Sequence, residues 1–362
     1  MSKYLLVGTY TGGLESDFPP TGSQGIYTFR IEADSGKLTP IGTFSNGDID
    51  PAFFAVRGRM VYVENERKDC GVIRSYEIGD DGALRFVSSV RAVGSKCAHI
   101  CADRYGPYVF GAVYSSGNVM VAKSDSTGNL VLTDVVQHHG RSVVPLRQDA
   151  PHAHSCCQMP GGNGLLVADL GIDKIMNYRL NRAFGKLEAN LRQPSVSVRP
   201  GDGPRHMTFH PNGAFLYLLT EMGNRIYVYS FDQVDNLLTE IQQISTLPEG
   251  FDGVSHAAEL ILSSDARYLY ASNRGHDTIA AYEVDGMTGL LKLKGFCASG
   301  GRGPRHICFG PGETVVYVSN LGSNSVCAIK RDPQSGALTE IIDHMAVPAP
   351  ACVAWAEAGE HL

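Results

Sequence analysis

The sequence has little positive charge and no long apolar run. Its 362 residues include 31 Lys and Arg against 37 Asp and Glu, a formal net charge of −6. Nucleic-acid-binding proteins ordinarily need a basic surface to displace counterions from phosphates, so this balance argues against a nucleic-acid partner. No apolar segment approaches the ~20 residues of a spanning helix, and the opening residues are too weakly apolar for a secretory signal. We therefore expect a cytoplasmic protein with no membrane partner.

The sequence also lacks paired cysteine motifs and a helical period. Its nine cysteines are scattered and include no paired C-x-x-C cluster, a pattern that favours reduced, mostly buried thiols. No segment keeps a 3.6-residue apolar repeat for three turns, so we expect negligible helix. The 41 Gly and 18 Pro are typical of a compact β-protein rich in turns.

A repeated turn is the main feature that the sequence does contain. Seven copies of Gly-x-Leu, one with Asn in place of Gly, follow one another at steps of 46, 46, 57, 51, 53 and 47 residues. Gly and Asn are the residues that most readily take the left-handed backbone of a tight hairpin. Each step is close to the length of one four-stranded sheet. The copies begin at Gly36, Gly82, Gly128, Gly185, Asn236, Gly289 and Gly336.

The blocks between these turns predict an all-β, seven-bladed β-propeller of four-stranded blades, a single domain over residues 1–362. A ring of blades keeps sheet edges short and protected, and a β-sandwich pair or a solenoid fits the ~50-residue unit less well. Residues 4–10, 25–30 and 37–43 supply outer strands without an inner one, and residues 351–355 supply the missing strand, so both termini should share one blade. The six complete blocks begin near Pro51, His99, His152, Arg205, His256 and Arg305.

Cations and imidazoles recur at the start of the first strand of several blocks. That strand lines the axis of a propeller, so polar residues at its start should converge from different blades. The repeat register makes His154, Arg205, Ala258 and Arg305 equivalent to one another, and His152 equivalent to His256. Guanidinium groups gathered in this way suit a carboxylate or a phosphate.

Glu221 and Arg274 end second strands on the same side of the predicted ring. As the single carboxylate expected among these cations, Glu221 should be ionised and could act as a base or as an orienting partner. Any one imidazole here could be structural, but several buried cations would repel one another without an anion to bind.

Other histidines and a metal site are weaker candidates. His152 and His154 with Cys156 and Cys157 could offer metal ligands, but no third ligand at a recognisable spacing completes the set, so we expect no metal. We expect His138, His139 and His210, which lie in loops and turns, to be solvated or to cap turns, whereas His276 and His344 give no signal.

Several short motifs resemble the lactonase family of seven-bladed β-propellers, and the resemblance covers nearly the whole chain. It rests on residues 7–11, residues 149–154, the Gly-Pro-Arg-His motifs at 203–206 and 303–306, and residues 219–221 and 271–275. The resemblance implies that His154, Arg205, Glu221 and Arg274 form the catalytic set and that no metal or organic cofactor is needed. An insertion around residues 137–141 has no counterpart in the other blocks and leaves the exact substrate open.

We therefore expect a small anionic lactone as substrate and a monomer or weak homo-oligomer. The favoured reaction is hydrolysis of 6-phospho-D-glucono-1,5-lactone to 6-phosphogluconate, a step of the pentose phosphate pathway. Arg305 with His152 or His256 would bind the phosphate, Arg205 or Arg274 would stabilise the oxyanion, and Glu221 or His154 would accept the proton of water. A cycloisomerase of the 3-carboxy-cis,cis-muconate lactonizing type and a non-catalytic binding propeller stay open as alternatives.

Overall fold

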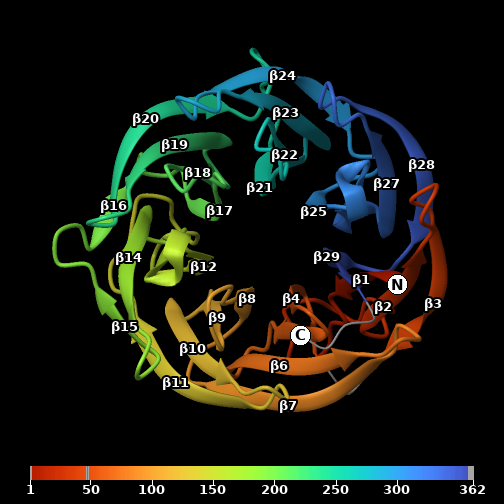
Figure 1. The fold of residues 1–362 in the computed structure, drawn as a ribbon, viewed down its shortest axis with the longest axis horizontal. Helices are drawn as coiled ribbons and strands as arrows, with labels where there is room; N and C mark the ends of the chain where they lie inside the picture. The colour runs from red at the N-terminus through yellow and green to blue at the C-terminus, as the bar shows by residue number, and fades with distance from the viewer. Residues whose placement is uncertain (1, 46, 48, 358–362) are drawn as a thin grey trace.

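Seven antiparallel sheets stand around a common axis (Figure 1). The computed structural model describes residues 2–45, 47 and 49–357. The strands nearest the axis are β4 (Phe53–Arg57), β8 (Cys97–Ala102), β12 (Ala153–Gln158), β17 (Pro204–Phe209), β21 (His256–Leu262), β25 (Pro304–Phe309) and β29 (Pro350–Glu357). The predicted seven-bladed propeller is confirmed.

Each inner strand is followed outward by three more strands. The second strands are β5 (Met60–Asn65), β9 (Tyr108–Val113), β13 (Gly164–Asp169), β18 (Phe215–Thr220), β22 (Tyr268–Arg274), β26 (Val315–Asn320) and β1 (Lys3–Thr9). The third strands are β6 (Gly71–Ile78), β10 (Asn118–Ser124), β14 (Lys174–Asn181), β19 (Arg225–Asp232), β23 (Thr278–Val284), β27 (Ser325–Arg331) and β2 (Ile26–Ile31).

The outer strands complete the blades. They are β7 (Leu84–Ala92), β11 (Leu130–Gln137), β15 (Lys186–Ala189), β20 (Leu237–Ser245), β24 (Leu291–Ala298), β28 (Leu338–Ala346) and β3 (Leu38–Phe44), and β16 (Ser195–Ser197) adds a short pairing with β14. Helix in the described residues is confined to three 3₁₀ turns, Pro160–Gly162, Pro311–Glu313 and Leu321–Ser323. None of these has the length to cross a membrane.

The ring closes through its two ends, as the sequence predicts. Strand β29 pairs antiparallel with β1, with Val353 opposite Val7 and Trp355 opposite Leu5. Strand β29 from the end of the chain and strands β1, β2 and β3 from its beginning therefore form one four-stranded blade. The backbone hydrogen bonds between β29 and β1 close the ring.

The repeated turn has the backbone conformation that its residue types require. All seven first residues have positive φ, from 56° at Asn236 to 89° at Gly128. These turns also link neighbouring blades, because a buried tyrosine hydroxyl of one blade donates to a turn carbonyl of the next. Tyr217 donates to Gly289, Tyr270 to Gly336 and Tyr317 to Gly36, at 3.0, 2.7 and 2.8 Å.

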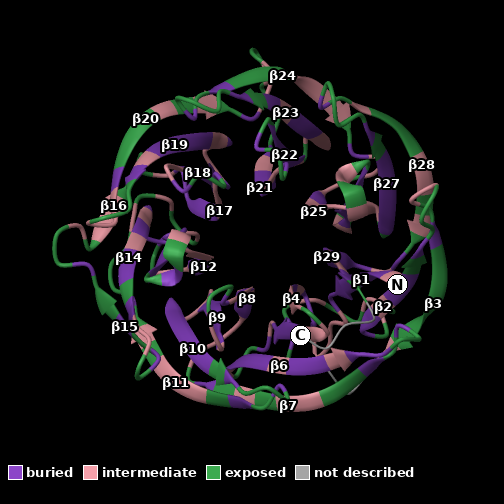
Figure 2. Cartoon of the chain, in the orientation of Figure 1, coloured by how far each residue is buried: buried purple, intermediate pink, exposed green. Residues whose placement is uncertain are grey.

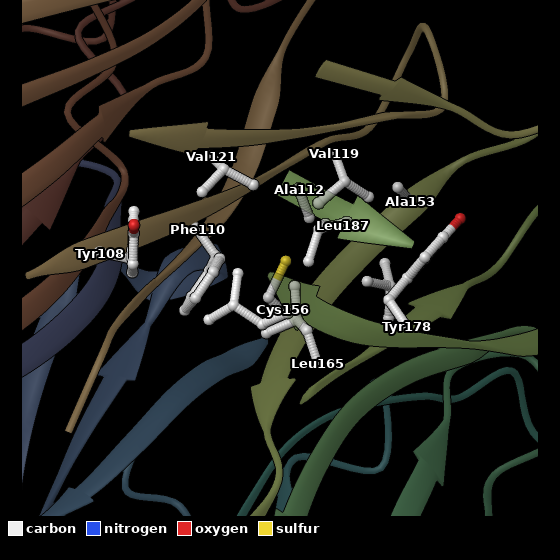
Figure 3. Packing of buried hydrophobic residues seen from close by; sticks show 12 residues of the cluster. Tyr108, Phe110, Ala112, Val119, Val121, Ala153, Cys156, Leu165, Tyr178 and Leu187 are labelled. Carbon is white, nitrogen blue, oxygen red and sulfur yellow. The ribbon is translucent and has the colours of Figure 1, made fainter. Parts of the chain in front are cut away.

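Apolar side chains between blades form the core. Figure 2 shows burial along the inner and middle strands and exposure along much of the outer ones, such as β3 and β24. Figure 3 shows one interface, where Phe110 and Val121 of one blade pack with Cys156 and Leu165 of the next. Burying a side chain of this size contributes about 1.5–3 kcal/mol, so each interface keeps the inner strands at fixed positions around the axis.

Candidate active site

A β-bulge near the start of several inner strands sets the position of the predicted site residues. The pairing register shifts between Ala153 and Ser155, between Pro204 and His206, and between Pro304 and His306. The extra residues at these three bulges are His154, Arg205 and Arg305. A bulge changes the direction of one side chain relative to its strand. Because the bulge is at the same place in all three blades, these side chains lie at the same height along the axis of the ring. The predicted equivalence of these positions is confirmed.

The carboxylate of Glu221, directly after β18, is the centre of a cluster of cations. Arg205 Nε and Arg274 Nη2 each lie 3.0 Å from Glu221 Oε2, and His154 Nε2 lies 3.8 Å from the same oxygen. Arg147 Nη2 donates to Glu221 Oε1 at 2.6 Å. The structure thus brings together all four residues of the predicted catalytic set.

Glu221, Arg205 and His154 are buried, and this burial affects their charge states. Burial alone would raise the pKa of Glu221, but Arg274, Arg205, His154 and Arg147 together hold it well below its usual range. Burial, with the nearby Arg205 guanidinium, lowers the pKa of His154 well below its ordinary value. At neutral pH the site therefore contains an ionised Glu221 beside a neutral imidazole. His154 Nδ1 is buried and has no hydrogen-bond partner among the described residues.

Arg205 is the most enclosed of the guanidinium groups. Its side chain is 3% exposed, against 20% for Arg274 and 36% for Arg147. Besides Glu221, it donates to the backbone carbonyl of Ala258 on the neighbouring blade. Burial, followed by repulsion from Arg274, lowers the pKa of Arg205 to about 9, so it stays a cation at neutral pH.

Arg147 reaches the cluster from the insertion between β11 and β12, and no sequence pattern marks it as a site residue. Gln148 anchors the insertion by donating to the carbonyl of Leu170 at 2.8 Å. His138 anchors it too, because its ring Nδ1 lies 2.6 Å from Asp169 Oδ2 and both side chains are fully buried. The expectation that His138 is solvated or caps a turn is therefore wrong. A non-repeating insertion has no register from which the reach of Arg147 could be deduced.

His139 and His210 agree better with expectation. His139 is exposed. His210 is buried, but its Nδ1 accepts the backbone N–H of Asn212 at 3.2 Å and so caps the turn after β17.

A second acidic group lies beside Arg305. Arg305 Nη2 lies 3.5 Å from Glu66 Oε1, which also accepts a hydrogen bond from the Tyr10 hydroxyl at 2.7 Å. The Arg305 guanidinium lies 5.2 Å from the centre of the Tyr10 ring. The expectation that Glu221 is the single carboxylate among these cations is therefore wrong, because Glu66 follows β5 as Glu221 follows β18.

Below this level the axis is filled by imidazoles, a carboxylate and an aromatic ring. Glu259 Oε2 lies 2.8 Å from His206 Nδ1 and 3.1 Å from His306 Nε2. The Phe53 ring packs at 4.5 Å from His99 and 5.0 Å from His306, between ring centres. These side chains form the floor beneath the Glu221 cluster. Across the part of the chain that the structure describes, no three His, Cys, Asp or Glu side chains are placed to hold a metal ion.

The two other predicted binding histidines lie at the edge of the cluster. The His152 ring stacks on Tyr114 with 4.6 Å between centres, and its Nδ1 lies 3.0 Å from the Tyr114 carbonyl. The His256 carbonyl accepts a hydrogen bond from Arg274 Nε at 3.3 Å. Both rings are partly exposed. Their roles in binding stay predictions.

Comparison with known proteins places the whole chain in one group. Residues 4–355 match the family model described as lactonase, 7-bladed beta-propeller. The chain is 30% identical to the 6-phosphogluconolactonase of Bacillus subtilis over 98% of both proteins. It is similar to the crystal structure of a putative 6-phosphogluconolactonase from Bacteroides fragilis, with a TM-score of 0.88, 28% identity and 98% of each chain covered. It is also similar to a periplasmic gluconolactonase of Pseudomonas aeruginosa, with a TM-score of 0.90, 30% identity, and coverage of 99% of this chain and 100% of that one.

Proposed function

We propose, since the chain belongs to the lactonase family of seven-bladed β-propellers, that this lactone hydrolase opens 6-phospho-D-glucono-1,5-lactone. The observation that carries the proposal is a buried carboxylate, Glu221, surrounded by Arg147, Arg205 and Arg274 beside a neutral His154. Such a site can bind an anion and stabilise an oxyanion within reach of a base. The name of the Bacillus subtilis relative supports the phosphorylated substrate.

In this mechanism Arg205 and Arg274 donate hydrogen bonds to the lactone carbonyl oxygen as it gains negative charge. His154 is the better candidate for the base, because its imidazole is neutral, whereas both carboxylate oxygens of Glu221 are already bound by guanidinium groups. The neutral imidazole takes a proton from the attacking water, and the imidazolium that forms is stabilised by Glu221, 3.8 Å away. Glu221 thus orients the two arginines and the histidine.

Arg305 and Arg147 would bind the anionic end of the substrate. Both side chains are partly exposed, at 20% and 36%, so solvent reaches them while Arg205 stays enclosed. His152 or His256, at the edge of the same cluster, would complete the phosphate contacts. Guanidinium groups match the geometry of phosphate oxygens better than an ammonium group does.

The proposal is tested with a panel of lactones, phosphorylated and not, by measuring acid release above the spontaneous rate. We expect a preference for the 6-phosphorylated lactone that Arg305→Ala removes. Arg302→Ala, an exposed arginine just before the same strand, is the matched control and should keep the preference. Equal rates on both kinds of lactone would contradict the phosphate assignment, and no rate above background would overturn lactone hydrolysis.

A cycloisomerase acting on a carboxylated muconate is checked in the same preparation. Ring closure removes the diene, so a fall in ultraviolet absorbance on mixing would favour this alternative over hydrolysis. We expect no change. The cytoplasmic location expected from the sequence stays a prediction, and one structural relative is named a periplasmic gluconolactonase.

A further inference from the structure

Two carboxylates enter the axial cluster from opposite parts of the ring. Glu66 directly follows β5 and Glu221 directly follows β18. Their backbone N–H groups make the same contact, Glu66 with the carbonyl of Asp50 at 3.1 Å and Glu221 with that of Gly203 at 2.8 Å. The blades that begin with β8 and β12 stand between them (Figure 1). The two side chains therefore face the same part of the axis from separated blades.

The charges of two arginines, Arg305 and Arg205, act on both carboxylates. Arg305, 3.5 Å from Glu66, lies close enough to Glu221 that each charge affects the other. Arg205, bonded to Glu221, likewise acts on Glu66. A small lactone bound between these arginines would therefore have a carboxyl group on either side.

The surroundings of the two carboxylates differ. Glu221 has three guanidinium groups within 3.0 Å, whereas Glu66 has one at 3.5 Å and a neutral Tyr10 hydroxyl. Burial raises the pKa of Glu66, and Arg305 and the hydrogen bond from Tyr10 offset this only in part. Asp50 and the deeper Glu64 also face it and disfavour a further negative charge. Two carboxyl groups whose pKa values are pushed apart are the usual arrangement for an acid and an anion in one site.

We propose that Glu66 is the general acid of the reaction, donating its proton to the ring oxygen that leaves when the lactone opens. Both the Tyr10 and the Arg305 contacts engage Oε1, so Oε2 can carry the proton. The Glu66 side chain is 15% exposed, so solvent can return the proton after each turnover. This inference rests on the proposed lactone hydrolysis.

The step balances with water as the only co-reactant. Water adds to the carbonyl carbon while its proton passes to His154, giving a tetrahedral oxyanion held by Arg205 and Arg274. The bond from the carbonyl carbon to the ring oxygen then breaks, and the ring oxygen takes the Glu66 proton to become a hydroxyl group. The product acid loses a proton to solvent, His154 releases its proton, and Glu66 regains one.

The test compares a lactone with the matching thiolactone, in which sulfur replaces the ring oxygen. A thiol has an ordinary pKa of about 8.5, so a thiolate leaves without protonation, whereas an alkoxide needs an acid. For Glu66→Gln we expect kcat on the lactone to fall about 100-fold or more, which is the usual contribution of a general acid. On the thiolactone we expect kcat to fall less than about fivefold. Glu77→Gln, a partly exposed carboxylate on β6 of the same blade that pairs with Arg59 at 3.4 Å, is the control and should leave both rates unchanged.

Each other outcome is decisive. An equal fall in kcat on the two substrates would show that Glu66 acts only on the structure of the site. An unchanged kcat on both would show that Glu66 has no role in the reaction. Either result overturns the inference. A wild-type protein that opens neither ring overturns the proposed function itself, and that failure is distinct from failure of the Glu66 assignment. Circular dichroism of each variant verifies that the fold is intact.

Discussion

Replacing Glu221 with Gln should destabilise the protein and make its stability depend on added anions. Oε1 of this carboxylate accepts a hydrogen bond from Arg147, and Oε2 pairs with Arg205 and Arg274. Gln keeps the shape but has one acceptor oxygen and no charge, so at least one guanidinium loses its partner. Removing one member of a buried ion pair typically costs about 3–5 kcal/mol.

That cost converts into a measurable shift of the melting temperature. With an unfolding entropy of about 2.1 cal/mol/K per residue, the 362-residue chain should melt roughly 4–7 °C lower. Phosphate at about 100 times its dissociation constant should restore about 2.7 kcal/mol to the variant, because it replaces the lost negative charge. The melting temperature of the wild type should rise less with phosphate, since the Glu221 carboxylate already offsets part of the charge of its guanidinium partners.

The assay is thermal unfolding at neutral pH with and without phosphate. Glu340→Gln is the matched control, because its carboxylate pairs with Lys330 at 3.3 Å on the surface, where such a pair contributes at most about 1 kcal/mol. An unshifted Glu221→Gln protein, or equal responses of variant and wild type to phosphate, would refute the anion-site reasoning.

Two further predictions concern Glu64 and Arg147. Burial and the neighbouring Glu66 raise the pKa of Glu64, and neither of its oxygens has a hydrogen-bond partner among the described residues. The unfolded chain therefore binds fewer protons than the folded one as pH rises above the ordinary Glu pKa of about 4.3, and folding loses about 1.4 kcal/mol per pH unit up to the folded pKa. Urea unfolding of Glu64→Gln should show an advantage over wild type that grows from pH 5 to pH 7; a constant difference would contradict this. Arg147→Ala should raise KM about tenfold with a smaller effect on kcat, as expected for a lost charge-assisted hydrogen bond to the substrate. Arg141→Ala, exposed on the same insertion, should leave KM unchanged, and an unchanged KM in both variants would exclude Arg147 from binding.

The repeat made most of the fold predictable. A turn that requires positive φ limits its first residue to types such as Gly and Asn, so the copies from Gly36 to Gly336 mark the blades directly. The same register placed Arg205 and Glu221 together although no contact is visible in the sequence. It did not find Glu66, because β4 pairs with β5 without the bulge that carries Arg205 in its own blade, so the first block has no cation at that position.

Other parts of the site depend on contacts that repeat no pattern. Arg147 reaches Glu221 because Gln148 and His138 fix the path of an insertion found in one blade. His138 looks like an ordinary loop residue in the sequence, and its burial follows from pairing with Asp169 on the neighbouring β13. Side-chain partners of this kind follow from the folded path of the backbone and cannot be deduced from spacing.

The most direct test of the account is the rate of acid release from 6-phospho-D-glucono-1,5-lactone by Arg205→Ala beside the wild type. Arg205 is enclosed, bonded to Glu221 and aimed by a bulge at the axis. Loss of an oxyanion donor typically slows turnover ~100 to 1,000-fold, and we predict a loss of this size in a variant that keeps its fold. A folded Arg205→Ala protein with the wild-type rate would contradict the proposed active site.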